Sequence, residues 1–239
     1  MRTATVALTL SAIVIGLPAD ADDDSQKLLR ASPRVLLDPE TYYSRLLFTK
    51  KSPPGPGEWL AEHPEPRQSF SQYAASHPRR PTRGRHTIVI SAVGPMSQVQ
   101  RSRFETLRAF MEIYYTMPVR LGKSLGLDGV TSRDRNLFGR TVRQYLTGDI
   151  LYRILRPALP EDAYCLLGVT MEDLYPDPSW NYVFGQATLS HRVGVYSLVR
   201  FYPAFWGETD SEARQRKGWL RSCHTLIHET GHMFGVHHC

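Results

Sequence analysis

One short segment near the C-terminus restricts the possible fold most strongly. It runs from His228 to Cys239 and reads HETGHMFGVHHC. His228 and His232 are four residues apart, so on an α-helix both imidazoles lie on one face, one turn apart. Gly235 then allows the chain to leave the helix abruptly, because glycine adopts left-handed backbone angles at little cost. The segment therefore predicts a helix that ends in a sharp turn, with His238 brought back towards the first two histidines.

This spacing is typical of a catalytic zinc site. Three imidazoles leave the fourth position of a tetrahedral ion open for water, whereas a structural site is closed by protein ligands. Glu229, next to the first histidine, is placed to act on that water as general base. We therefore expect His228, His232 and His238 to bind Zn²⁺ and Glu229 to be catalytic. The alternative is a surface helix whose histidines are solvated and bind nothing.

Two neighbouring histidines are not expected to be ligands. His224 shares the helical stripe one turn before His228, but three residues spaced four apart extend along about 12 Å of helix axis, too far for one ion. His224 is therefore expected to be a partly exposed helix residue. His237 precedes the expected third ligand and would point elsewhere if the turn takes this path.

Composition limits the remaining function classes. With 239 residues, 41% of them hydrophobic, the chain can bury one good core. Its net charge is +6, and the basic residues are scattered except at Arg79, Arg80, Arg83 and Arg85. No aromatic residues are interleaved there, so we interpret the run as a solvated linker and expect no nucleic-acid partner. Three cysteines are too few for a disulfide framework, and Cys165 is expected to be a buried small hydrophobe.

The N-terminal segment Met1–Ala21 has the features of a secretory signal peptide. Arg2 precedes an almost uncharged stretch, which is followed by small residues suited to cleavage. The apolar stretch is too short to favour a membrane-spanning helix. We therefore expect secretion, and a disordered or amphipathic leader on a cytoplasmic protein is the alternative. Residues 22–85 are rich in proline and glycine and predict an irregular arm.

Residues 86–239 predict a globular domain of the α/β class. Strands are expected at Thr87–Val93, Pro118–Leu125 and Ala163–Met171, and helices at Arg103–Met117 and Thr141–Leu155. Strands that alternate with helices indicate a largely parallel sheet covered by helices.

The last part of this domain predicts a sheet edge and a long helix. Tyr182–Leu189 and Gly194–Phe201 are separated by a short turn, which favours an antiparallel or edge element that an extended peptide could join. The long helix is expected at Ser211–Phe234. Its sheet-facing residues are expected to be Trp219, Leu220, Cys223, Leu226, Ile227 and Phe234.

Further segments carry a family resemblance. They read PEDAYCLLGVTMEDLYP at residues 160–176, WNYVFGQA at 180–187, RSCHTLIHE at 221–229 and, more weakly, WLAEHPEP at 59–66. Together with the cysteine directly after His238, these segments resemble the archaemetzincin family of zinc peptidases. The resemblance covers most of the chain, although about the first 30 residues look unlike the family.

The resemblance implies a metzincin fold: a twisted mixed sheet with a backing helix, a C-terminal active-site helix and a smaller C-terminal subdomain. It also implies that His228, His232 and His238 hold the zinc, that Glu229 is the base, and that short peptides are hydrolysed, with aminopeptidase action as one mode. We expect a peptide as substrate and a monomeric protein.

Members of the family continue past the residue that matches Cys239, with further cysteines that hold a second, structural zinc and a methionine turn beneath the catalytic zinc. If the chain ends at Cys239, this C-terminal subdomain is missing and no second zinc is expected. Zinc binding and activity should then be weak, because His238 stands close to a chain end and lacks supporting contacts. A catalytically silent form that binds zinc or peptide without turnover is therefore the alternative function. An interaction protein with incidental histidines is a further one.

Overall fold

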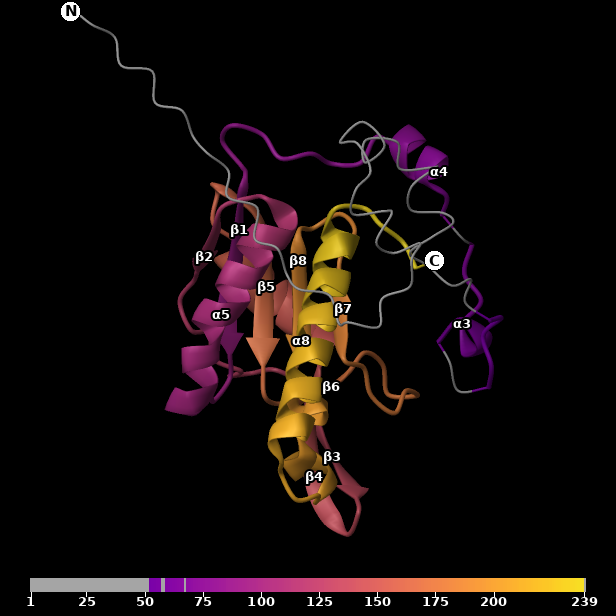
Figure 1. Ribbon diagram of the computed structural model, residues 1–239, viewed down its shortest axis with the longest axis vertical. Coiled ribbons are helices and arrows are strands. Elements are labelled where there is room, and N and C mark those ends of the chain that lie inside the picture. The colour runs from indigo at the N-terminus through magenta and orange to yellow at the C-terminus, as the bar shows by residue number, and fades with distance from the viewer. Residues whose placement is uncertain (1–51, 57–58, 67, 239) are drawn as a thin grey trace, which may run out of the picture. The chain divides into compact units, whose positions relative to one another are not determined.

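The computed structural model describes residues 52–56, 59–66 and 68–238, shown as coloured ribbon in Figure 1. The chain divides into two compact units, Met1–Pro64 and Glu65–Cys239. Within its described residues, the first unit contains the short helix α3 (Trp59–Glu62). The predicted signal peptide Met1–Ala21 lies outside the described residues, and the predicted domain boundaries stay predictions. No helix in the described ranges is both long and apolar enough to cross a membrane.

A five-stranded sheet forms the centre of the Glu65–Cys239 unit, in the order β2–β1–β5–β8–β7. Its strands are β1 (Thr87–Val93), β2 (Val119–Leu121), β5 (Ala163–Thr170), β7 (Gly185–Ala187) and β8 (Val193–Ser197). The first four in spatial order are parallel, and β7 runs antiparallel to β8 at the edge. Every residue of β5 is buried, as its apolar sequence predicts for a strand covered on both faces. The α/β class is therefore confirmed.

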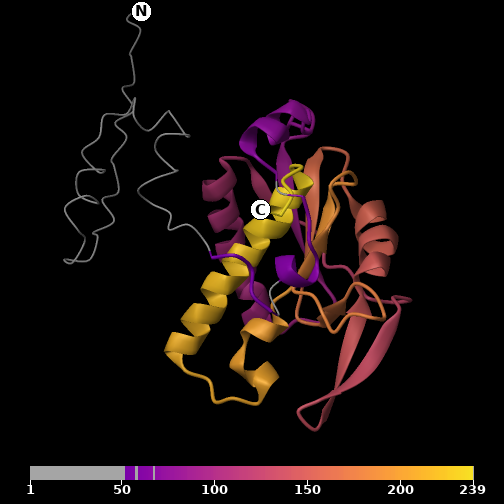
Figure 2. The ribbon, with the colours of Figure 1, turned by 90° about the vertical axis from the view of Figure 1, so that its right-hand side faces the viewer.

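Helices cover both faces of this sheet (Figures 1 and 2). On one face lie α5 (Gln98–Tyr115) and α8 (Glu212–Met233), which bury Leu107, Met111 and Leu226 against the sheet. The other face is covered by the consecutive turns α6 (Thr147–Asp149), η2 (Ile150–Leu155) and α7 (Arg156–Ala158). Side chains alternate across β1, so Ile88 and Ile90 face the long helices, while Val89 and Val93 face η2.

The predicted helix at Thr141–Leu155 is wrong in its first half. Those residues belong to a hairpin of β3 (Ser132–Leu137) and β4 (Arg140–Leu146), and β4 also pairs with β6 (Asp173–Tyr175) in a second sheet. Phe138 and Gly139 both have positive φ, at 56° and 74°, which fits a two-residue hairpin turn. The apolar spacing from Val142 onwards imitates a helical stripe. In the structure, the apolar residues of β4, such as Val142 and Tyr145, lie on a strand and are only half-buried.

Other predicted elements differ mainly in their ends. The strand expected at Pro118–Leu125 is short, and β8 stops at Ser197, where the turns η3 (Val199–Phe201) and η4 (Pro203–Trp206) follow. Of the residues predicted to face the sheet from α8, Leu220 is wrong, because 54% of its surface is exposed. The predicted irregular arm contains a short helix, α4 (Phe70–Ala75), which begins at a capping box on Ser69. Cys165 is fully buried, as predicted.

Candidate metal centre

The C-terminal end of α8 carries His228, Glu229 and His232, and the chain then turns sharply. The amide of Val236 donates to the carbonyl of Gly231, 3.1 Å away, and the amide of Gly235 donates to that of His232 at 2.9 Å. Gly235 has a φ of 90°, so this is a Schellman-type helix end that requires glycine. The turn predicted from the sequence is therefore present, and it brings His238 back over the helix.

The three histidines meet at one point. The Nε2 atom of His232 lies 3.1 Å from that of His228 and 3.1 Å from that of His238, and the remaining pair is 3.2 Å apart. A metal held by three imidazoles at about 2.0–2.1 Å in tetrahedral geometry needs ligand atoms roughly 3.3 Å apart. The cluster therefore has the dimensions of a zinc site.

The hydrogen bonds of the Nδ1 atoms determine whether the Nε2 atoms of His232 and His238 carry a proton or a free lone pair. Nδ1 of His232 lies 2.7 Å from the carbonyl of Val236, and Nδ1 of His238 lies 2.8 Å from a carboxylate oxygen of Glu65. Both partners only accept hydrogen bonds, so both Nδ1 atoms donate and both Nε2 atoms present lone pairs. Lone pairs that converge at this distance repel each other unless a cation lies between them. The donor set thus fits a metal ion of the zinc type.

Loss of hydration keeps the rings of His228 and His232 neutral. Loss of hydration, with smaller contributions from His232 and His238, lowers the pKa of His228 to about 4. Loss of hydration is also the main reason why the pKa of His232 is lowered. Metal ions bind the neutral imidazole, so at neutral pH protons do not compete for these two nitrogens.

Glu229 lies on the inner side of α8 and is 5% exposed. Burial raises the pKa of its carboxyl to about 8. Its Oε2 atom has no hydrogen-bond partner among the described residues. A buried carboxyl without a partner is costly to a fold, and such groups concentrate at functional sites.

The edge strand β7 packs directly on Glu229. A Cβ atom added at Gly185 would lie 2.6 Å from Oε1 of Glu229 and 2.7 Å from its carboxyl carbon. Only glycine at this position therefore leaves room for the carboxyl group. The sequence predicted an edge element here, and the structure places it beside the expected base.

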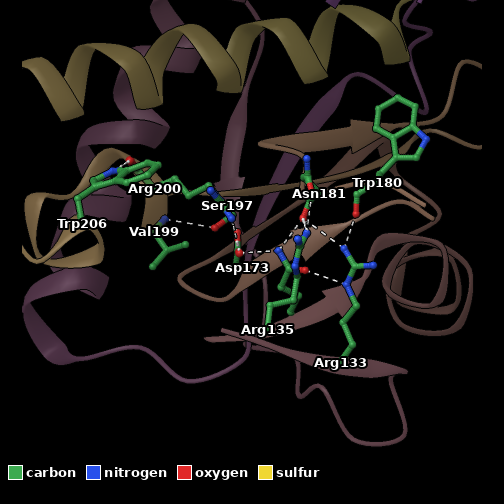
Figure 3. A network of polar contacts seen from close by, with 10 residues as sticks. Arg133, Arg135, Asp173, Trp180, Asn181, Ser197, Val199, Arg200 and Trp206 are labelled. Carbon is green, nitrogen blue, oxygen red and sulfur yellow. Dashed lines mark hydrogen bonds and ion pairs between the residues drawn. The ribbon is translucent and has the colours of Figure 1, made fainter. Parts of the chain in front are cut away.

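A polar network fixes the loop that leads into β7 (Figure 3). Arg200 donates from Nε and from a terminal nitrogen to the two carboxylate oxygens of Asp173, each at 2.7 Å, and both side chains are buried. Gln144 joins Asp173 to the carbonyl of Asn181, at 2.8 and 2.9 Å. Arg133 donates to the carbonyls of Pro178, Trp180 and Asn181. The second sheet thus holds the loop, and the loop positions the edge strand.

Sequence reasoning missed the residues that support the third histidine. Glu65 bonds to His238, and the Gln68 side chain bridges the carbonyl of Gly235, at 3.3 Å, and the amide of His237, at 3.0 Å. Tyr73 donates from its hydroxyl to the carbonyl of Phe234 at 3.1 Å. The only signal for this support was the weak family similarity at residues 59–66, which includes Glu65.

The structure brings together three of the four predicted site residues, His228, His232 and His238, and Glu229 follows the first of them on the same helix. His224 is exposed on α8 and is not part of the histidine cluster. His237 is exposed, and its backbone amide binds Gln68 while His238 enters the cluster. The expectations for these two histidines therefore agree with the geometry. Cys239 lies outside the described residues.

A mixed α/β domain with three convergent histidines on its last helix and turn has the architecture of a protein with a zinc-type metal site. No protein-family model matches the sequence. Archaemetzincin-2 of Macaca fascicularis and that of Homo sapiens are each 31% identical to it, over 77% of this chain and 58% of the relative. Archaemetzincin-2 of Mus musculus is 29% identical, over 98% of this chain and 70% of the relative.

Over most of its length the chain is similar to members of the archaemetzincin family. It spans 58% of the length of the primate relatives. The crystal structure of archaemetzincin from Methanopyrus kandleri is also similar, with 26% identity and a TM-score of 0.47, over 66% of this chain and 78% of that one.

Proposed function

We propose that this chain is a zinc-dependent peptidase that hydrolyses peptide bonds, with His228, His232 and His238 as zinc ligands and Glu229 as general base. The observation that carries the proposal is the convergence of three Nε2 atoms within 3.2 Å, with a buried, unpartnered carboxyl on the same helix. Similarity to archaemetzincins over most of the chain supports it.

The proposed roles follow from the chemistry of each group. Bound zinc would act as a Lewis acid that polarises the scissile carbonyl and makes water more acidic. Glu229 takes a proton from the attacking water and passes it to the leaving amine. Burial raises the pKa of its carboxyl to about 8, which supports this role, because a proton shuttle has to hold the proton between the two steps.

Strand β7 supplies the proposed binding edge for the peptide. One side of β7 pairs with β8, and the described residues place no strand on its other side. An extended peptide can pair with such an edge through main-chain hydrogen bonds, while alternate side chains enter pockets. Because Gly185 touches Glu229, a peptide that lies antiparallel along β7 brings its backbone past the base. Short peptides are the proposed substrates, and cleavage from the amino end is one proposed mode.

Zinc content, oligomeric state and processing of the protein are also part of the proposal. We propose one zinc ion per chain, a monomer, and secretion after removal of Met1–Ala21. N-terminal sequencing of the mature protein checks the last of these, because a start near Asp22 requires processing.

Two measurements test the proposed function. Metal analysis after dialysis against micromolar zinc should find about one equivalent in the wild type. A bound amount below half an equivalent contradicts the metal site. A quenched-peptide assay should then show hydrolysis by the wild type, and Glu229→Ala should lose it while still binding zinc. Equal rates in the two proteins exclude hydrolysis by this site. Zinc bound without turnover in either protein identifies the silent alternative.

A further inference from the structure

A cavity whose lining includes none of the three clustered histidines lies at the N-terminal ends of the parallel strands. It measures about 250 Å³ and is lined by four arginines, together with Tyr164 and Thr82. The arginines are Arg79, Arg80, Arg85 and Arg192. Three of them come from the basic run that the sequence indicated to be a solvated linker, and the fourth precedes β8. Residues far apart in the sequence therefore place their positive charges around one space.

The basic run is exposed, but it is held in place. The backbones of Thr82 and Arg85 exchange two hydrogen bonds of 3.0 Å each, so residues 82–85 form a tight turn. Arg85 donates from Nε to the carbonyl of Glu161 at 3.2 Å. Tyr164 donates from its hydroxyl to the carbonyl of Arg79 at 2.8 Å. These contacts fix the backbone that carries the arginines.

Arg192 is the most constrained member of the group. Its backbone has a φ of 61°, which a residue with a side chain adopts only at an energetic cost. One terminal nitrogen of its guanidinium donates to the carbonyls of Ala163 and Tyr164, at 2.7 and 3.3 Å. Burial, and then the charges of Arg85 and Arg79, lower its pKa. The arginines therefore repel one another here, and the fold holds them together nonetheless.

Within residues 68–238, the salt bridges leave the charge of these arginines unbalanced. Among the described residues, none of the four arginines forms an ion pair with an acidic side chain. The contacts of Arg85 and Arg192 go to backbone carbonyls, which carry no net charge. Asp162, next to Glu161, is paired with Arg120 at 3.0 Å. In the part of the chain that the structure describes, no acidic side chain therefore neutralises the arginines of this cavity.

We propose that this arginine cavity binds a phosphoryl group, either free phosphate or a phosphate monoester. Guanidinium groups form paired hydrogen bonds with phosphate oxygens, and the hydroxyl of Thr82 adds a neutral donor at the cavity wall. A phosphoryl group carries close to two negative charges at neutral pH, so it offsets more of this charge than a single carboxylate does. The volume of about 250 Å³ accommodates one such group.

Isothermal titration of the zinc-loaded protein tests this proposal, with inorganic phosphate and phenyl phosphate as separate probes at constant ionic strength. We expect the wild type to bind at least one of them, and the double variant Arg79→Gln/Arg85→Gln to bind it at least fivefold more weakly. Arg192→Gln should also weaken binding. Because Arg192→Gln also loses the bonds to the carbonyls of Ala163 and Tyr164, which help it to fold, the double variant carries the test.

Lys123→Gln is the control for loss of charge. Lys123 is exposed and follows the C-terminal end of β2, at the opposite end of the parallel sheet from the cavity. Removal of this charge should leave the affinity for either probe unchanged within twofold.

Absence of binding to the wild type at 10 mM of either probe overturns the proposal. Equal weakening in Lys123→Gln also does so, because it indicates general charge attraction. Loss of binding after zinc removal places the anion on the metal and overturns it as well. Comparison of the two probes shows whether the site takes free phosphate or a monoester.

Discussion

Gly185 on the edge strand and Glu229 on the last helix are in direct contact, with no space for a side chain between them. A Cβ atom at Gly185 would come within 2.6 to 2.8 Å of three atoms of the Glu229 side chain. The position of the proposed base therefore depends on a glycine more than forty residues away in the sequence. The same strand is the proposed binding edge for the peptide, so substrate and base are positioned by one element.

Gly185→Ala is the first prediction from this contact. The new methyl group must displace the Glu229 carboxyl, and a shift of about 1 Å in a catalytic group can lower the rate about 10²-fold. We expect kcat for a quenched peptide to fall by about that factor, while the protein still binds one equivalent of zinc. Gly148→Ala is the matched control, because nothing lies within 4 Å of its added methyl group. A Gly185→Ala enzyme with the wild-type kcat would refute the positioning role.

The sequence predicted the histidine cluster because all its members lie within one helix and one turn. Local spacing determines such an arrangement, and Gly235 marks the turn. Buried strands such as Ala163–Thr170 were also predictable, since an apolar run of this length fits a strand covered on both faces.

Features that depend on distant contacts could not be predicted in this way. Glu65 supports His238 across 173 residues, and no local pattern marks this pairing. The β3–β4 hairpin was missed because its strands are polar and only half-buried, so their alternation carried less apolar signal than the neighbouring helical spacing. Here the Phe138–Gly139 turn was the better indicator.

Glu65 should determine zinc affinity more than turnover. Its carboxylate accepts from Nδ1 of His238, and loss of such a partner lowers metal affinity about 10–100-fold. We expect Glu65→Ala to weaken zinc binding by this factor in a competition assay with a chromophoric chelator, and Glu65→Gln to weaken it less. Glu161→Gln, an exposed carboxylate outside the histidine cluster, should have no effect. If Glu65→Ala binds zinc as tightly as the wild type, the contact has no role in holding the metal.

Replacing the buried base should stabilise the metal-free protein. Burial raises the pKa of Glu229 from near 4.5 to about 8 in the folded state, so folding penalises the charged form. The penalty is absent below pH 4.5, grows as pH rises, and is complete above pH 8. In the presence of EDTA, Glu229→Gln should therefore raise Tm relative to the wild type at pH 8.5, and by much less at pH 5. Glu161→Gln serves as the control, and a Tm difference that is the same at both pH values contradicts this explanation.

The buried pair Arg200–Asp173 should matter far more to stability than a surface pair of similar geometry. Both of its side chains are at most 7% exposed, so Arg200→Met leaves Asp173 charged in the interior without its partner. Breaking a buried pair in this way costs about 3–5 kcal/mol. By contrast, Arg143 pairs with Asp134 at the surface, where such pairs contribute about 0–1 kcal/mol, so Arg143→Met should change little. Urea unfolding of both variants measures the difference in the free energy of unfolding.

Because Asp173 also binds Gln144, which holds the loop before β7, Arg200→Met should raise KM for peptides as well. A variant that loses stability but keeps the wild-type KM would show that the network supports the fold without positioning the edge strand.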